Sequence, residues 1–308
     1  MNPPIIYFSN RCESIFDHAL QPLGGKSFID SGSKIDFLYF CTHSDKLKPL
    51  AKEITFDLID RQFSVPLANR SRLARSLNLA GLDTLKTYFL PNDIPKDRER
   101  LWFVKNPLSS GGRDIFCVRS EDVLSVFEDG FIIQEGATNL DMIENRKYTI
   151  KAYVLYLNGC VYVFNEAIVL VHGKEYSELD VSSEAQYLHA GCEQVGSKVK
   201  LECFRKLSNY EYIYNNIKNS ISDVLGIFMN TLNCGDKNSY CIFSLDYLVT
   251  KALDVLLIEI NDRPNLIHTT EINQKVNIPM LQAAFVIMMP SLLSSIQHPH
   301  LRFSKLIG

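Results

Sequence analysis

Two long apolar segments joined by Asn158-Gly159 place the strongest constraint on how this chain can fold. Residues 148–157 and 161–170 have the composition of β-strands, and an Asn-Gly pair between such segments is typical of a tight hairpin turn. Residues 242–249 and 255–260 form a second pair of strand-like segments. Because strand pairs follow one another directly, the sequence predicts an α+β fold of mixed α/β layers rather than a regularly alternating parallel sheet.

The other segments predict helices and short strands. Apolar residues recur at helical spacing in three segments, residues 69–79, 209–229 and 278–296, and Pro290 interrupts the last of them. We also predict a helix at 121–128, a long polar loop at 172–203, and short strands at 35–40, 56–59, 101–105, 115–118 and 131–134. From the changes in pattern we expect an N-terminal α/β lobe at residues 1–66, a central lobe at 67–135 and a C-terminal lobe at 136–308.

Composition excludes several classes of protein. Hydrophobic residues make up 46% of the chain and charged residues 22%, as in ordinary globular proteins. The net charge of −3 argues against a nucleic-acid partner. We expect no membrane partner, since the apolar run 283–289 is too short to span a bilayer and the N-terminus does not resemble a signal peptide. The 8 cysteines include no Cys-x-x-Cys pair, which favours reduced thiols and a cytoplasmic location.

Acidic groups in otherwise apolar strands are the sharpest chemical signal. Glu259 and Asn261 are two residues apart, so their side chains leave the same face of a strand. If residues 242–249 and 255–260 pair as a hairpin, Asp246 can approach that face. Two carboxylates and an amide oxygen make a hard-oxygen site, which Mg²⁺ uses together with phosphates and waters. A lone carboxylate in a strand is usually structural, whereas three oxygen ligands converging from two apolar strands favour a metal site.

A glycine-containing loop is a second signal. It follows Lys105, at the end of an apolar strand, and contains Ser109-Ser110-Gly111-Gly112. Glycines let backbone N–H groups approach phosphate oxygens, and serine hydroxyls add donors. Taken alone, the loop is better explained as an ordinary glycine-rich hairpin loop.

Two lysines on one strand face are a third signal. Lys147, Thr149 and Lys151 alternate along a strand and therefore share a face. Such a strand is often a solvated sheet edge. If the face turns inward, it can instead clamp an anion.

Taken together, these segments resemble the ATP-grasp superfamily, and within it the tubulin–tyrosine ligase-like branch. The family's phosphate loop, Lys-Pro-x-x-Ser-Ser-Arg-Gly-Arg-Gly-Ile, is similar to residues 105–115. Its Arg-Lys-Phe-Asp-Ile-Arg strand is similar to residues 146–151, and its closing Asp strand and Glu-Ile-Asn-x-x-Pro motif to Asp246 and residues 259–264. Its upstream basic helix resembles residues 69–76. The motifs occur in the right order over residues 67–266.

The resemblance implies an ATP-grasp fold, with the nucleotide between two β-sheet lobes, and ATP and Mg²⁺ as cofactors. Lys105 and Lys147 would hold the α/β-phosphates. Asp246, Glu259 and Asn261 would hold one or two Mg²⁺ ions. The other residues that it places at the nucleotide are Ser109, Ser110, Gly112, Gln134 at the adenine hinge, Glu135, Gly136 and Asp246.

The resemblance also implies a reaction, that of an ATP-dependent carboxylate–amine ligase. Such enzymes phosphorylate a carboxylate, and an amine then attacks the acyl phosphate to form an amide. Lys151 and Arg113 become catalytic candidates at the γ-phosphate or the acyl phosphate, and Arg263 becomes one at a substrate carboxylate. The partners would be a carboxylate acceptor, which is a peptide, protein or small molecule, and an amino-acid or amine donor. Residues 172–200 would line or cover the acceptor site. The net charge of −3 argues against acidic tubulin tails as the acceptor.

Departures from the family pattern leave alternatives open. The family's aspartate in the basic strand is Thr149 here and its arginine is Lys151, while its Thr-Asn pair corresponds to His189-Ala190. A different substrate would explain these changes, and so would a nucleotide-binding pseudoenzyme. An ATP-grasp kinase that phosphorylates its substrate without an amine step is a third possibility. Loss of the aspartate makes the site more positive by about one charge, so we expect Thr149→Asp to raise the acceptor KM without changing ATP affinity. The alternative is that Thr149 only packs and Lys151 only replaces the arginine's charge, and the substitution would then leave acceptor preference unchanged.

Overall fold

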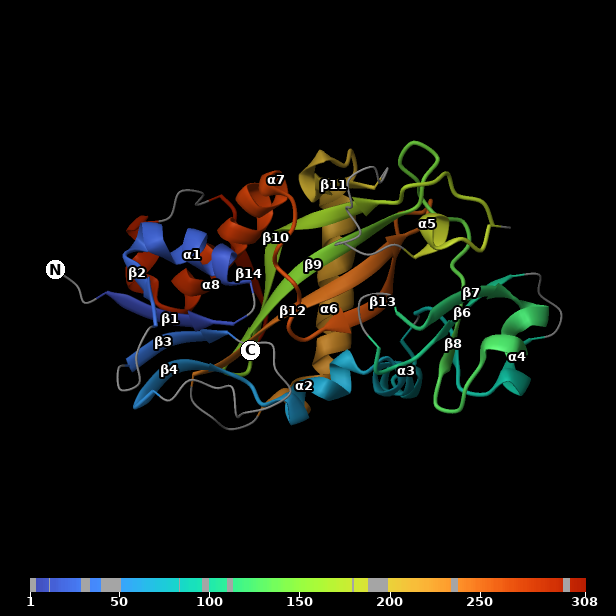
Figure 1. Ribbon diagram of the computed structural model, residues 1–308, viewed down its shortest axis with the longest axis horizontal. Helices are drawn as coiled ribbons and strands as arrows, with labels where there is room; N and C mark the ends of the chain where they lie inside the picture. The colour runs from blue at the N-terminus through green and yellow to red at the C-terminus, as the bar shows by residue number, and fades with distance from the viewer. Residues whose placement is uncertain are drawn as a thin grey trace.

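A computed structural model describes most of the chain (Figure 1). The described residues are 4–10, 12–28, 34–39, 51–82, 84–95, 100–109, 113–178, 180–187, 199–233, 238–295 and 300–308. Two of the predicted site residues, Ser110 and Gly112, lie outside these ranges, and so does the His189-Ala190 pair.

Two β-sheets form the framework. The strands of the large sheet are β1 (Ile5–Ser9), β2 (Gly25–Ser27), β3 (Lys34–Tyr39), β4 (Glu53–Leu58), β9 (Tyr148–Leu157), β10 (Cys160–Val171), β11 (Lys200–Cys203), β12 (Ser239–Val249), β13 (Val255–Asn261) and β14 (Phe303–Ile307). They lie in the order β11-β10-β9-β12-β4-β3-β1-β2, with β13 beside β12 and β14 beside β10. The small antiparallel sheet, in the order β5-β8-β6-β7, contains β5 (Thr87–Tyr88), β6 (Leu101–Lys105), β7 (Ile115–Arg119) and β8 (Ile132–Glu135).

Helices cover both faces of the large sheet. The α-helices are α1 (Glu13–Leu20), α2 (Arg61–Ala68), α3 (Arg70–Leu79), α4 (Val123–Val126), α5 (Ser183–Gln186), α6 (Tyr210–Leu232), α7 (Thr270–Ile272) and α8 (Ile278–Met288). Between α7 and α8 lies a π-helical segment, η6 (Asn273–Asn277). Segments of 3-10 helix are η1 (Gln21–Leu23), η3 (Pro91–Asp93), η4 (Ser120–Asp122), η5 (Phe204–Lys206) and η7 (Pro290–Ser295).

The predicted mixed α/β architecture is confirmed. Strands β1 to β4 pair in parallel, whereas β9, β10, β12 and β13 pair antiparallel. The β9–β10 hairpin turns at Asn158 and Gly159, which have φ values of 49° and 81°. Two consecutive positive φ angles match the twist of a two-residue hairpin, and Asn and Gly adopt them at the lowest steric cost.

Two predicted segments differ from the structure. The helix predicted at 121–128 is a 3-10 turn followed by the single turn α4, because Phe127 is already extended and Gly130 has a φ of 90°. The loop predicted at 172–203 contains α5 and ends in β11, which pairs with β10. Strand β11 arises from a tertiary contact, its pairing with β10, which the local sequence does not report.

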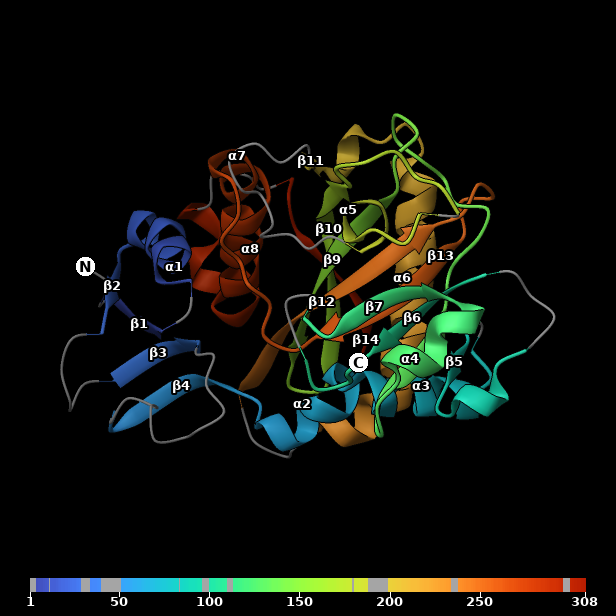
Figure 2. The same ribbon diagram turned by 45° about the vertical axis from the view of Figure 1, so that its right-hand side comes forward.

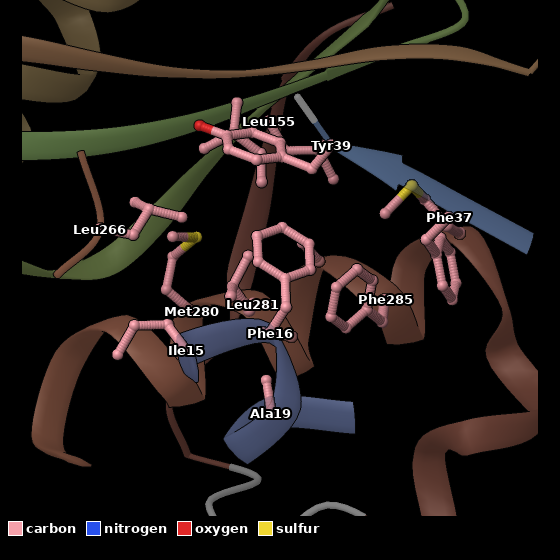
Figure 3. Close-up of a cluster of buried hydrophobic side chains, with 14 of the residues drawn as sticks. Ile15, Phe16, Ala19, Phe37, Tyr39, Leu155, Leu266, Met280, Leu281 and Phe285 are labelled. Carbon is pink, nitrogen blue, oxygen red and sulfur yellow. The ribbon is translucent and has the colours of Figure 1, made fainter. Parts of the chain in front are cut away.

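One strand of the large sheet serves both the core and a cavity. On one face of β9, Ile150 and Val154 pack in the core that α6 covers. On the opposite face, Tyr153 and Leu155 pack in a second core with α1 and α8. Figure 3 shows part of this second core, in which Phe16 and Phe285 lie between the sheet and the helices. Lys151 lies on this same face of β9, and its side chain lines a cavity.

Candidate functional site

A cavity of about 290 Å³ lies between the two sheets. The small sheet contributes residues of β6, β7 and β8, and the large sheet contributes residues of β9, β10, β12 and β13. Figures 1 and 2 show the small sheet beside the β12–β13 end of the large sheet. The remaining walls come from Leu85, Ala137, Lys147 and His172, from residues 186–187 and from the loop that follows β13.

A row of charged side chains crosses three adjacent strands at one wall of this cavity. In the sheet register, Asp246 on β12 lies opposite Lys151 on β9 and opposite Glu259 on β13. The Lys151 Nζ atom donates to both carboxylate oxygens of Asp246, at 2.7 and 3.0 Å. Asn261 donates from Nδ2 to Glu259 Oε1 at 3.4 Å. The convergence of Asp246, Glu259 and Asn261 that the sequence predicted is therefore present.

A helix outside both sheets adds a further charged side chain to this row. Arg70, at the start of α3, donates to Glu259 Oε2 at 2.5 and 2.8 Å. Its Nη1 atom also donates to the carbonyl oxygens of Asn106 and Ser109, at 3.2 and 2.6 Å. Arg70 thus connects a predicted metal ligand to the loop that the sequence predicted at the phosphates.

The pKa values of the two carboxylates in the row are shifted in opposite directions. Burial raises the pKa of Asp246, although Lys151 opposes this effect. Burial also acts to raise the pKa of Glu259, but the charges of Arg70, Lys105 and Lys151 outweigh it and lower that pKa to about 2. Glu259 is therefore the more firmly ionised member, and a proton shared by the pair resides on Asp246.

Two buried lysines, Lys105 at the end of β6 and Lys147 just before β9, line the same cavity as the row. Burial lowers the pKa of Lys105 to about 7 and that of Lys147 to about 8. The ammonium groups are held by amide oxygens: Lys105 donates to Gln134 Oε1 at 2.6 Å, and Lys147 to the Gln186 carbonyl at 2.9 Å. Both lie over the ring of Phe103, at 5.4 and 5.1 Å from its centroid. Two desolvated cations that are held by neutral acceptors form a site for an anion.

Other predicted residues also line the cavity. Gln134 and Glu135 do so from β8, and Glu135 forms an ion pair with Arg100. Arg263 is buried, lines the cavity, and donates to the Ile59 carbonyl at 3.2 Å. Thr149 lines it beside Lys151.

Three predicted residues are placed differently. Gly136 donates its N–H to the Leu101 carbonyl at 2.8 Å, and a Cβ atom there would lie 2.6 Å from that oxygen. Its place is therefore explained by the close approach of β8 to β6. Ser109 and Arg113 do not line the cavity as the described residues define it; the Ser109 hydroxyl donates to the Arg113 carbonyl at 2.8 Å, and the Arg113 side chain is exposed.

The sequence interpretation assigned no role to Arg70, Gln186 or His268. A signal for Arg70 was available, because it shares the buried stripe of α3 with Leu73, Ala74 and Leu77 at spacings of three, four and seven residues. An arginine on an apolar stripe needs a buried partner. Gln186 ends the single-turn helix α5, inside the segment 172–200 that the sequence placed at the acceptor site, and one turn is too short to show a periodicity. His268 lies in a loop, where periodicity carries no signal.

The oxygen donors of the row fit a divalent cation, provided that an amide oxygen is one of the ligands. Asp246, Glu259 and Asn261 offer two carboxylates and an amide, which is the donor chemistry that Mg²⁺ prefers. The described residues contain no group of three His, Cys, Asp or Glu side chains placed to hold a metal, so the amide oxygen is needed. The ion pairs with Lys151 and Arg70 would have to loosen when the cation binds.

A cavity between a large mixed sheet and a separate antiparallel sheet defines an ATP-grasp-like fold. Residues 81–297, more than half of the chain, match the family model of the tubulin–tyrosine ligase family, and the chain belongs to that family. Its relatives include tubulin glycylase 3D of Tetrahymena thermophila, 25% identical over 58% of this chain, and a probable tubulin–tyrosine ligase of Schizosaccharomyces pombe, 29% identical over 45%.

The chain spans part of the length of these relatives. The aligned segments cover 20% of the glycylase and 37% of the probable tyrosine ligase. Within the described residues, no helix combines the length and the apolar character needed to cross a bilayer.

Proposed function

We propose that this protein is an ATP- and Mg²⁺-dependent carboxylate–amine ligase that joins an amino acid to a carboxylate through an acyl-phosphate intermediate. The single observation that supports this most directly is that the row Lys151–Asp246–Glu259 and the buried pair Lys105 and Lys147 line one cavity. Family membership supports the same reaction class. The names of the relatives favour a protein or peptide acceptor over a small molecule.

The buried lysines would bind the phosphates. Lys105 and Lys147 are 5% and 4% exposed, so they reach an anion without competition from bulk water. The phosphate oxygens would take over from Gln134 and Gln186 as hydrogen-bond acceptors. A charge-assisted contact of this kind is typically worth about 1.5–3 kcal/mol.

The acidic row would hold Mg²⁺ against the β- and γ-phosphates. Bound Mg²⁺ supplies charge neutralisation in phosphoryl transfer. Asp246, Glu259 and Asn261 would provide oxygen ligands, which frees Lys151 from Asp246. Lys151 can then face the transferred phosphoryl group, whereas Arg113 would reach the site only if its loop moves inward.

The proposed reaction has two steps, and in each step one bond between heavy atoms forms and one breaks. The carboxylate oxygen of the acceptor bonds to the γ-phosphorus and the bond to ADP breaks. The amine nitrogen then bonds to the acyl carbon, inorganic phosphate leaves, and the nitrogen loses a proton. The protein's part is to position the reactants and to neutralise charge.

The direct test is amino-acid-dependent release of ADP and phosphate. Purified full-length chain is incubated with MgATP, each of the common amino acids, and acceptors that include glutamate-rich peptides and small carboxylates. We expect ADP release that requires both substrates and yields a product with the mass of an amide. A product with the mass of a phosphorylated acceptor would instead identify a kinase. Nucleotide binding without any ADP release would contradict the ligase proposal.

A nucleotide-binding pseudoenzyme is the second candidate. The observation that favours it is that both carboxylates of the row already have internal cationic partners, Lys151 for Asp246 and Arg70 for Glu259. The departure at Thr149 agrees with it. Under this proposal MgATP raises the thermal stability of the chain, but no acceptor and amine combination releases ADP.

A further inference from the structure

His268 lines the cavity, and none of the roles above uses it. It lies in the loop between β13 and α7. Both ring nitrogens are buried, and neither has a hydrogen-bond partner among the described residues. Buried polar atoms are nearly always paired in folded proteins. An imidazole on a cavity wall that has no protein partner can pair with a molecule that enters the cavity.

The backbone of His268, by contrast, is held on both sides by one side chain. The His268 N–H donates to Asn273 Oδ1 at 2.9 Å, and its carbonyl accepts from Asn273 Nδ2 at 3.0 Å. Asn273 is the first residue of the π-helical segment η6. Segments of this kind are rare and occur frequently at functional sites.

A second buried asparagine connects this clamp to the large sheet. Asn277 is 0% exposed and donates to Asn273 Oδ1 at 3.0 Å and to the Leu266 carbonyl at 2.9 Å. Tyr153 on β9 donates its hydroxyl to Asn277 Oδ1 at 3.0 Å. The loop is thus fixed to the strand that carries Lys151, while the imidazole itself has no such contact. This arrangement positions the ring in advance of binding.

The electrostatic environment of the ring favours an anion. Burial and the charge of Lys151 lower the pKa of His268 to about 4, so the ring is neutral near pH 7, with one N–H donor and one acceptor nitrogen. Arg263 and Asn265 line the same part of the cavity wall, in the loop that leads from β13 to His268. Lys105 and Lys147, whose ammonium groups lie 5.4 and 5.1 Å from the centroid of the Phe103 ring, also line the cavity.

We propose that His268 is a substrate-binding residue that donates a ring N–H to a carboxylate of the substrate other than the nucleotide. The proposal rests on the proposed function, because it assigns the Lys105–Lys147 end of the cavity to the phosphates. Two groups have the required chemistry: the acceptor carboxylate, and the α-carboxylate of the amino-acid donor. Because two asparagines hold the backbone of this loop, His268 would also discriminate against a substrate that lacks this carboxylate.

The test uses two variants of the full chain. His268→Phe keeps an aromatic ring and removes both nitrogens, and His268→Gln keeps an N–H donor. His18→Phe is the matched control, because His18 is exposed on α1. Binding is measured by calorimetry, with and without a non-hydrolysable ATP analogue and Mg²⁺.

The probes distinguish the carboxylate of the amino-acid donor from that of the acceptor. Glycine and tyrosine, each against its carboxamide, report on the donor. A capped hexaglutamate peptide, against its glutamine counterpart, reports on the acceptor. We expect wild type to prefer the carboxylate member of one pair, His268→Phe to weaken that binding by about tenfold or more, and His268→Gln to restore most of it. The affinity for the ATP analogue should stay unchanged in every variant.

Every other outcome contradicts either the role of His268 or the proposed ligase function. Wild type that shows no carboxylate preference, or a Phe variant that binds like wild type, would overturn the role of His268. A Gln variant that binds as weakly as the Phe variant would do the same, since the N–H would then be irrelevant. Binding of a carboxylate probe that depends on His268, by a chain that never binds the ATP analogue, would support the His268 site and contradict the proposed ligase.

Discussion

Glu259 combines the strongest charge constraints in the cavity. It accepts two hydrogen bonds from Arg70, lies beside Asp246, and is influenced by two lysines. A carboxylate that is this firmly ionised keeps its charge over the whole physiological range of pH. Its chemistry therefore depends on which cation it faces, and Mg²⁺ and Arg70 compete for it.

We expect Glu259→Gln to abolish turnover while the chain still folds. The substitution preserves volume and removes the charge that would bind Mg²⁺. Because the amide can still accept from Arg70, the cost to stability should stay below about 3 kcal/mol. ADP release at increasing Mg²⁺ concentrations measures the effect, with circular dichroism as the check on folding. Turnover near that of wild type, with unchanged Mg²⁺ dependence, would remove Glu259 from the metal site.

The lowered pKa of Lys105 predicts that nucleotide binding takes up protons. The Lys105 pKa is about 7 in the folded chain and 10.5 in its ordinary environment. At pH 8 the free site is thus mostly unprotonated, and phosphate binding favours the protonated form. ATP affinity should fall as pH rises from about 7 to 9, and calorimetry at pH 8 in buffers of different ionisation enthalpy should show proton uptake.

Lys105→Ala is the control for that uptake. It should weaken ATP binding by about tenfold or more and reduce the number of protons taken up, leaving the smaller contribution of Lys147, whose pKa is about 8. The same linkage acts on stability. Below pH 7 both the folded and the unfolded chain carry the proton, so burial of the charge opposes folding there, and this cost declines as pH rises toward 10.5. If wild type and Lys105→Ala take up equal numbers of protons when ATP binds, the proton binds to a group other than Lys105.

At the scale of elements, the position of the small sheet depends on close backbone contacts at its strand ends. Gly136 follows β8 and approaches β6 so closely that a side chain would collide with the Leu101 carbonyl. The same strand presents Gln134 to Lys105. A displacement of β8 would therefore reach the cavity through the amide that holds the buried lysine.

Gly136→Ala should destabilise the chain by about 1–3 kcal/mol, which is typical of overpacking, and should weaken ATP binding as well. Gly226→Ala is the matched control. Gly226 lies within α6, and nothing lies within 4 Å of an added Cβ atom there. That variant should be more stable than wild type by roughly 0.5–1 kcal/mol, as is usual for glycine to alanine in a helix. Urea denaturation measures both. Equal behaviour of the two variants would contradict the steric argument.

At the scale of the whole molecule, the first strands and the last long helix share one core. Phe285 on α8 lies 4.5 Å from Phe37 on β3 and 5.9 Å from Phe16 on α1, measured between ring centroids. Strand β4 also pairs with β12, so the N-terminal strands continue the large sheet. These contacts predict that the N-terminal strands unfold together with the rest of the sheet.

Phe285→Ala should lower the stability of the chain by about 3–5 kcal/mol, the usual cost of removing a core aromatic side chain. The single tryptophan, Trp102, lies in the small sheet, so its fluorescence reports on a region remote from this core. If the chain unfolds as one unit, the fluorescence and circular dichroism transitions shift together. A fluorescence transition that stays unchanged while circular dichroism becomes biphasic would show that the N-terminal lobe unfolds by itself.

The strand pairs and the local geometry within them could be predicted from residues that are close together in the chain. The long apolar segments, Asn158-Gly159 and the spacing of Glu259 and Asn261 depend on neighbours along the chain, and the structure bears them out. The buried stripe of α3 was equally readable, although the partner of Arg70 was not. Local periodicity reports which face of an element is buried, because that face repeats with the period of the element.

Tertiary structure alone decided which of these faces meet. Lys151 and Asp246 are far apart in sequence, and they lie opposite each other because β12 pairs with β9 in one particular register. Arg70 reaches Glu259 only because α3 packs against the end of the sheet, and His268 reaches the cavity only because two asparagines fix an irregular loop. Register between non-consecutive strands and the placement of loops follow from packing and buried hydrogen bonds between remote residues, which no local pattern encodes.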